Sequence, residues 1–165
     1  MSSSITPLRD YGKLQRYGKG MPGGLDMVKD GWAARNNGLS NADAFIDQLP
    51  ANLLRLERPY VIILELPASG VTNPVLPAHR DYNKTCGINV YLEASGEVTT
   101  FYNWNRESRE CEYVEEFCAA PGEIWVMNTD VPHSVALVPN TPRSMLSFCF
   151  TKTTYSEVLK CFPQK

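Results

Sequence analysis

The sequence predicts a mainly β fold with N-terminal helices, in which the strands form a sandwich or barrel such as a jelly roll. Two observations favour this fold. From Tyr60 onward, short segments rich in Val, Ile, Tyr, Phe and Thr alternate with Pro, Gly, Asn or Ser. Before Tyr60 lies most of the helix-like sequence, and a chain of 165 residues has the length of one domain.

Residues 1–57 are expected to form a helical and irregular support for the β core. Residues 18–24 contain four glycines and one proline, which indicates an irregular connector. Ser40 or Asn41 is expected to cap a helix that ends near Pro50, and a second short helical turn follows it. The apolar residues of these two segments are Phe45, Ile46 and Leu49 in the first, and Leu53, Leu54 and Leu56 in the second.

The predicted jelly-roll core covers residues 58–152. Its eight expected strands lie at residues 60–66, 75–82, 86–93, 97–104, 111–118, 122–128, 133–138 and 143–151. Short strands in this number are typical of a sandwich or barrel. Residues 153–165 are expected to form a tail that contains a short helix over roughly 153–160.

The charge of the chain argues against several classes of partner. The formal net charge is −2 and the pI is about 5.7, so a broad basic surface for nucleic acid or anionic membrane is not expected. No run of 18 apolar residues is present, and the N-terminal segment does not resemble a secretory signal. Neither nucleic acid nor a membrane is therefore an expected partner. The compact size of the chain leaves little room for a separate substrate domain and favours a small molecule, an amino acid or a short peptide segment as the substrate.

The cysteines indicate a reducing compartment. Their number is odd, their spacing is irregular and no CxxC pair occurs, so neither a disulfide framework nor a zinc site is expected. We interpret them as reduced thiols of a cytoplasmic protein. They are Cys86, Cys111, Cys118, Cys149 and Cys161.

The two histidines of the chain and one aspartate form the strongest chemical pattern. Side chains two apart on a strand point to the same side, so His79 and Asp81 are expected to face one way. His133 lies 52 residues after Asp81, at the start of a later predicted strand. Two imidazoles and one carboxylate are the ligand set of non-haem Fe(II) oxygenases. Each histidine also has an ordinary structural interpretation as a packed side chain, but the joint pattern favours a metal site.

Arg143 adds a site for an anion. It begins a strand in which Leu146, Phe148 and Phe150 alternate onto one face. Arg143 shares the other face, toward the expected cavity, with Met145 and Ser147. A buried guanidinium needs an anionic partner, and its fork suits a carboxylate. The alternative is a surface arginine at a strand start.

These residues together resemble the signature of the Fe(II)/2-oxoglutarate-dependent dioxygenases, whose fold is a double-stranded β-helix, or cupin-like jelly roll. The resemblance covers roughly residues 60–151 and is similar to prolyl-hydroxylase-like and aspartyl/asparaginyl-β-hydroxylase-like members. The segments that carry it are His79-Arg80-Asp81, Val90-Tyr91-Leu92-Glu93, Pro121-Gly122-Glu123 with the following strand, His133-Ser134-Val135, and Pro142-Arg143.

The resemblance implies a role for each matching residue. His79, Asp81 and His133 would be the catalytic ligands of Fe(II), and Arg143 would bind the far carboxylate of 2-oxoglutarate. Tyr91 is a second candidate for that carboxylate, and its alternative is a core tyrosine. Asn89 shares the face of Tyr91 and is a weaker candidate. The implied reaction is a hydroxylation with O2, in which 2-oxoglutarate becomes succinate and CO2, with ascorbate as an optional cofactor.

Three departures limit the choice of subfamily. The glycine-rich motif of many prolyl hydroxylases is reduced to Gly96-Glu97-Val98-Thr99-Thr100-Phe101, and many of those enzymes have lysine where Arg143 stands. Nucleic-acid demethylases of this superfamily carry a second arginine six residues later, where this chain has Cys149. A nucleic-acid substrate is therefore disfavoured.

Two interpretations from other classes remain open. In the first interpretation, the chain is a cupin-like metal- or ligand-binding protein without oxygenase activity. In the second, it is a β-rich interaction module in which the residue pattern is accidental. The identity of the substrate and the oligomeric state do not follow from the sequence.

Overall fold

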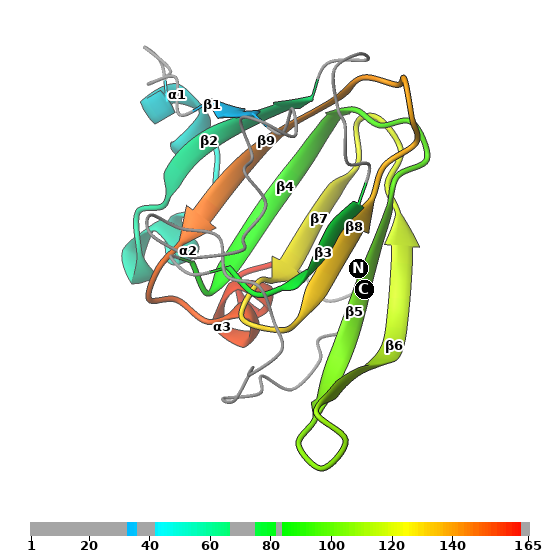
Figure 1. The fold of residues 1–165 in the computed structure, drawn as a ribbon. Coiled ribbons are helices and arrows are strands. Elements are labelled where there is room, and N and C mark those ends of the chain that lie inside the picture. Colours follow the sequence, from blue (N-terminus) through cyan, green and yellow to red (C-terminus); the bar gives the residue numbers. More distant parts are fainter. Residues whose placement is uncertain (1–32, 36–41, 67–74, 82–83, 163–165) are drawn as a thin grey trace.

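The computed structural model describes residues 33–35, 42–66, 75–81 and 84–162. Within this part of the chain, two antiparallel sheets stack face to face as a jelly-roll double-stranded β-helix (Figure 1). The predicted fold class is therefore confirmed. The connector expected at 18–24 and the helix cap expected at Ser40 or Asn41 lie outside the described residues.

The first sheet has five strands in the order β1-β2-β9-β4-β7, and all its neighbours are antiparallel. Its strands are β1 (Ala33–Arg35), β2 (Tyr60–Leu66), β4 (Cys86–Glu93), β7 (Ile124–Asn128) and β9 (Arg143–Phe150). Strand β1 falls in the region expected to be helical or irregular. Its three residues pair with β2, so a tertiary contact rather than a local pattern creates it.

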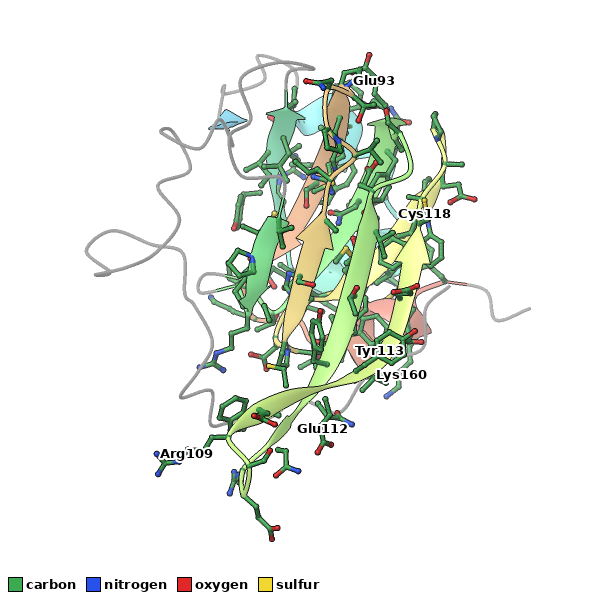
Figure 2. The ribbon with its side chains drawn as sticks, turned by 45° about the vertical axis from the view of Figure 1, so that its right-hand side comes forward. Glu93, Arg109, Glu112, Tyr113, Cys118 and Lys160 are labelled. Atoms are coloured by element: carbon green, nitrogen blue, oxygen red, sulfur yellow. The ribbon has the colours of Figure 1, made fainter. Side chains whose placement is uncertain are left out.

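The second sheet has four strands in the order β3-β8-β5-β6. Its strands are β3 (Val75–His79), β5 (Val98–Asn105), β6 (Glu110–Cys118) and β8 (His133–Ala136). The long β5–β6 hairpin extends past the other strands, and Arg109 lies at its tip (Figure 2). As the outer strand, β6 carries exposed side chains such as Tyr113, which is 62% exposed.

Three short helices lie in the described part of the chain: α1 (Ala42–Ile46), α2 (Ala51–Leu56) and α3 (Tyr155–Lys160). Helix α3 begins with a capping box, in which the Thr154 side chain accepts from the Glu157 N–H and Glu157 accepts in return from the Thr154 N–H. None of the described helices has the length and apolar character needed to cross a membrane.

The main hydrophobic core lies between the five-stranded sheet and the helices. Leu146, Phe148 and Phe150 of β9 belong to it, together with Ile46, Leu53, Cys86, Ile88, Val126, Tyr155 and Val158. Because strand side chains alternate, Arg143, Met145 and Ser147 lie on the opposite face, which is turned toward the second sheet. Polar residues of β4 and β9 are therefore buried between the sheets, where the expected cavity was placed.

Glu57, at the end of α2, fastens this helix to the chain after β9. Its carboxylate accepts hydrogen bonds from the backbone N–H groups of Thr151, Lys152 and Thr153 at 2.9, 3.0 and 2.8 Å, and from the Thr151 hydroxyl at 2.8 Å. Burial alone would raise the pKa of this carboxyl, but these hydrogen bonds lower the pKa of Glu57 to about 2.

We expect Glu57→Gln to lower the free energy of unfolding at pH 7 by about 1–3 kcal/mol, since charged hydrogen bonds are lost. The folded pKa is depressed, so this contribution is present above the ordinary pKa of 4.5 and is lost as the pH falls toward about 2. Urea unfolding at pH 7 and pH 3 measures both effects, with exposed Glu116→Gln as the control. A difference that persists undiminished at pH 3 would contradict the assignment.

Candidate metal centre

The two histidines meet because their strands pair. His79 is the last residue of β3 and His133 the first of β8, and the two are Cα partners in the antiparallel ladder. Both side chains are buried, and their ring centroids lie 4.5 Å apart. Two histidines far apart in the chain are thus brought into direct contact.

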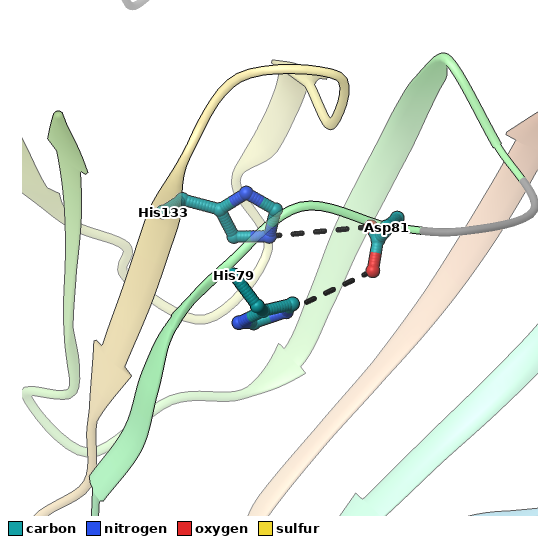
Figure 3. A group of neighbouring side chains, drawn as sticks. All are labelled: His79, Asp81 and His133. Carbon is teal, nitrogen blue, oxygen red and sulfur yellow. Dashed lines mark ion pairs between the residues drawn. The ribbon is translucent and has the colours of Figure 1, made fainter. Parts of the chain in front are cut away.

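Asp81 completes the group from outside the strand. Residues 75–82 were predicted as one strand, but β3 ends at His79, so alternation along a strand does not place the carboxylate. A hydrogen bond of 3.0 Å from the Asp81 N–H to the Thr129 carbonyl places the residue instead. Thr129 precedes the segment that leads to His133. Figure 3 shows the three side chains turned toward one another.

The ligand atoms have the proximity of a metal site. Asp81 Oδ1 lies 3.8 Å from His79 Nε2, and Asp81 Oδ2 lies 4.0 Å from His133 Nε2 (Figure 3). One ligand atom from each residue falls within 4.8 Å of the others. Two nitrogen donors and one carboxylate oxygen at this proximity are a ligand set that suits a divalent transition metal.

The backbone determines which nitrogen of each histidine is available. His79 Nδ1 lies 2.8 Å from the Pro77 carbonyl, and His133 Nδ1 lies 2.9 Å from the Val131 carbonyl. A carbonyl oxygen only accepts, so each Nδ1 carries the hydrogen and each Nε2 presents a lone pair. Support of this kind on the far nitrogen is what orients histidine ligands in metal sites.

The protonation states also suit a cation. Burial, together with the neighbouring His133, lowers the pKa of His79 to about 3, and burial lowers the pKa of His133. Both imidazoles are therefore neutral near pH 7. Burial would raise the pKa of Asp81, but Lys84 and the two histidines lower it overall, so the carboxylate is ionised.

Lys84 is a neighbour that the sequence pattern did not reveal. Its Nζ lies 3.1 Å from Asp81 Oδ2, and the lysine side chain is largely buried. The two residues are only three apart, but Lys84 lies beyond the end of β3 and outside any strand, so strand alternation does not predict the contact. The ammonium compensates the charge of Asp81 and leaves Oδ1 facing His79.

Arg143 and Tyr91 form a second polar group on the inner face of the five-stranded sheet. Arg143 is 6% exposed and Tyr91 1% exposed. The guanidinium carbon lies 5.7 Å from the centre of the Tyr91 ring. Among the described residues, the Tyr91 hydroxyl is the one buried side-chain polar atom without a hydrogen-bond partner. Such an atom is expected to meet a ligand or water.

Asn89 lies on the same face, and its amide already has two contacts. Its oxygen accepts from the Ser147 hydroxyl at 2.6 Å, and its nitrogen donates to Met127 Sδ at 2.8 Å. Ser147 and Asn89 are Cα partners across β4 and β9. The structure therefore places Asn89 near Tyr91 but engages its amide in the sheet itself.

The carboxylate beside Arg143 was missed in the sequence. Arg143 Nε donates to Glu97 Oε1 at 2.9 Å, and Glu97 is 3% exposed. The alternation of side chains along the strand could have predicted its burial. Glu97 lies two residues before Thr99 and four before Phe101, so the three share one face, and all three are buried. Phe101 pairs with His133, so this face of the chain points to the metal ligands.

All five cysteines are described by the structure, and all are free thiols, as expected. Cys149 is fully buried on β9, at the position where a second arginine was considered. None of them belongs to the candidate metal group formed by the described residues.

No protein-family model and no curated protein matches the chain. Solved structures are similar to it at low identity. A cupin domain from Bordetella pertussis is 16% identical, over 56% of this chain and 81% of that chain, with a TM-score of 0.37. A recombinant oxalate oxidase in complex with glycolate is 14% identical over 56% and 42% of the chains, with a TM-score of 0.39.

An Fe(II)-HppE with an alternative substrate is 16% identical over 55% of this chain and 41% of that chain, with a TM-score of 0.33. This chain thus spans less than half of both enzyme chains. The jelly-roll assignment rests on the strand order and pairing of this protein, and the chemistry of the site rests on its own residues.

Proposed function

We propose that this protein is a non-haem Fe(II)/2-oxoglutarate-dependent oxygenase that hydroxylates a small molecule or an amino-acid or peptide side chain. The observation that carries the proposal is the group of the buried His79 and His133 with the partly exposed Asp81, whose ligand atoms lie within 4.8 Å of one another. A second buried polar pair, Arg143 and Tyr91, supports a cosubstrate with a carboxylate.

In this proposal His79 Nε2, His133 Nε2 and Asp81 hold the iron, and the backbone carbonyls behind each imidazole keep the rings oriented. Bound iron and 2-oxoglutarate together would supply the oxidising chemistry that activates O2. The two histidines are buried, while the Asp81 carboxylate is partly exposed. Lys84 orients the Asp81 carboxylate through its second oxygen.

Arg143 and Tyr91 would hold the far carboxylate of 2-oxoglutarate. A guanidinium and a phenol both donate to carboxylate oxygens, and a charge-assisted hydrogen bond is stronger in a buried setting. The unpartnered Tyr91 hydroxyl fits this role, because the ligand would satisfy it.

One observation favours the second candidate, a cupin-like metal- or ligand-binding protein without oxygenase activity. Arg143 is already paired with Glu97 through Nε, so a carboxylate ligand is not required to compensate its charge. This candidate predicts binding of the metal without binding of 2-oxoglutarate.

The test is an anaerobic titration of metal-free protein with Fe(II) and then 2-oxoglutarate, in which the weak visible charge-transfer band of the chelate is followed. We expect a band that is absent in His79→Ala and weakened in Arg143→Ala. Fe(II) binding without a band would favour the cupin-like candidate. No Fe(II) binding would exclude the oxygenase and leave a β-rich binding module.

A further prediction concerns Tyr91→Phe, which should weaken the binding of 2-oxoglutarate without lowering the free energy of unfolding. Removing an unpartnered buried hydroxyl should leave the free energy of unfolding unchanged or raise it by up to about 1 kcal/mol. The same change should weaken 2-oxoglutarate binding by about 3–10-fold, which is the loss of one hydrogen bond. Urea unfolding and calorimetric titration measure the two effects. A destabilised variant with unchanged binding would make Tyr91 an ordinary core residue.

A further inference from the structure

The end of β4 and the turn before β5 contact the beginning of β9 through three side-chain hydrogen bonds. Ser95 Oγ donates to the Pro142 carbonyl at 3.0 Å, and Ser144 Oγ donates to Glu93 Oε2 at 3.1 Å. Between them, Arg143 Nε donates to Glu97 Oε1 at 2.9 Å. The consecutive residues Pro142, Arg143 and Ser144 thus all form hydrogen bonds with residues between Glu93 and Glu97.

Both oxygens of Glu97 are engaged. Oε1 accepts from Arg143, and Oε2 accepts from the backbone N–H of Ser95 at 2.8 Å. Gly96 has a φ of +90° and lets the chain reverse between these residues, in a conformation that L side chains rarely adopt. The hydrogen bond from Ser95 therefore fixes the Glu97 carboxylate independently of its contact with the guanidinium.

The guanidinium of Arg143 is oriented from more than one direction. Its Nε donates a hydrogen bond to Glu97, and the ring of Tyr91 lies beside the group. Its Nη2 lies 3.4 Å from Met145 Sδ. A thioether is a weak acceptor, so this last contact is easily exchanged for a better one. The Tyr91 hydroxyl without a partner lies in the same group.

We infer that Glu97 is a positioning residue for the cosubstrate pocket. It holds Arg143 by the Nε edge and so presents the Nη nitrogens, together with the Tyr91 hydroxyl, to a ligand carboxylate. The inference rests on the proposed function, because it concerns the same ligand. It adds a residue that the sequence pattern did not assign and that would not touch the cosubstrate.

Two physical effects of Glu97 have opposite signs, and this makes the inference testable. The negative charge of Glu97 repels an incoming carboxylate, so a purely electrostatic role predicts tighter binding once it is removed. A positioning role predicts weaker binding, because Arg143 gains rotamer freedom that the ligand must then restrict. The direction of the change in affinity therefore decides between them.

The experiment compares the wild-type chain with Glu97→Ala and Glu97→Gln, each loaded anaerobically with Fe(II) and titrated with 2-oxoglutarate by calorimetry. The amide introduced by Glu97→Gln has a single oxygen in place of two, so it does not match both donors, Arg143 Nε and Ser95 N. Glu93→Gln is the matched control, since Glu93, the last residue of β4, accepts a hydrogen bond from Ser144, the neighbour of Arg143. 2-Oxobutyrate, which lacks the far carboxylate, is the control ligand.

We expect 2-oxoglutarate to bind about tenfold more weakly to Glu97→Ala and by a smaller factor to Glu97→Gln. Glu93→Gln and the affinity for 2-oxobutyrate should remain unchanged. In nitrogen-15 NMR spectra, the Arg143 Nε–H signal, identified by its loss in Arg143→Met, should shift and exchange faster with water in Glu97→Ala. Should Glu97→Ala fail to fold, Glu97→Gln supplies the same comparison.

Unchanged or tighter binding of 2-oxoglutarate in the Glu97 variants would overturn the inference and leave the proposed function standing. An equal weakening for 2-oxobutyrate would also overturn it, because the effect would then not involve the far carboxylate. A wild-type chain that binds Fe(II) but neither keto acid would instead refute the proposed function itself.

Discussion

Replacing His79 with alanine is expected to weaken Fe(II) binding by at least about 100-fold, because changes even to residues behind a ligand cost about 10–100-fold. Asp81→Asn should have a comparable effect, since it removes the anionic ligand and one ion-pair partner of Lys84. Anaerobic calorimetric titration with Fe(II) measures the loss. Added Fe(II) should also raise the melting temperature of the wild-type chain but not of the variants.

The control for Asp81→Asn is Glu116→Gln, which makes the same chemical change on an exposed position of β6. It should bind Fe(II) as the wild type does. Equal Fe(II) affinity in the wild type and in both His79→Ala and Asp81→Asn would show that the buried group does not bind the metal. The histidines would then be structural partners of the Pro77 and Val131 carbonyls.

Arg143→Met is expected to have the largest effect on stability, about 3–5 kcal/mol of the free energy of unfolding. This is the ordinary consequence of breaking a buried ion pair, because Glu97 would keep an uncompensated charge at 3% exposure. The same variant should bind 2-oxoglutarate more weakly while it retains Fe(II), since the metal ligands are unchanged.

The double variant Arg143→Met/Glu97→Gln separates stability from binding. It removes both charges, so we expect most of the lost free energy of unfolding to return, while 2-oxoglutarate binding stays as weak as in Arg143→Met. Urea unfolding and calorimetric titration of the four proteins in this cycle provide the test. Full stability in Arg143→Met alone would mean that the pair does not matter to the fold. Normal 2-oxoglutarate binding in the double variant would remove Arg143 from the proposed pocket.

The sequence by itself determined the fold class and the three residues that the structure brings together as a candidate metal group. Strand composition and the period of two identified the β segments, and the predicted ranges differ from the observed ones by only a few residues at most ends. The parity of β9 correctly divided Leu146, Phe148 and Phe150 from Arg143. These features are local, so a single chain segment contains the information that specifies them.

What the tertiary structure decided is which groups meet. Asp81 reaches the histidines through a hydrogen bond to Thr129 and not through the strand that was predicted for it. Strand β1 exists only as a partner of β2, and Lys84 contacts Asp81 from a segment without a pattern. The anion that compensates Arg143 comes from Glu97, 46 residues earlier.

The physical reason for this division is the range of the interactions. Backbone geometry and side-chain alternation act between near neighbours and leave a period in the sequence. Ion pairs and hydrogen bonds between distant segments depend on where two strands end relative to each other. The spacing of residues along the chain does not predict this relative position. Sequence reasoning therefore identified His79, Asp81, His133 and Arg143, whereas the structure was needed to show their charged partners, which are Lys84, three residues from Asp81, and Glu97, 46 residues before Arg143.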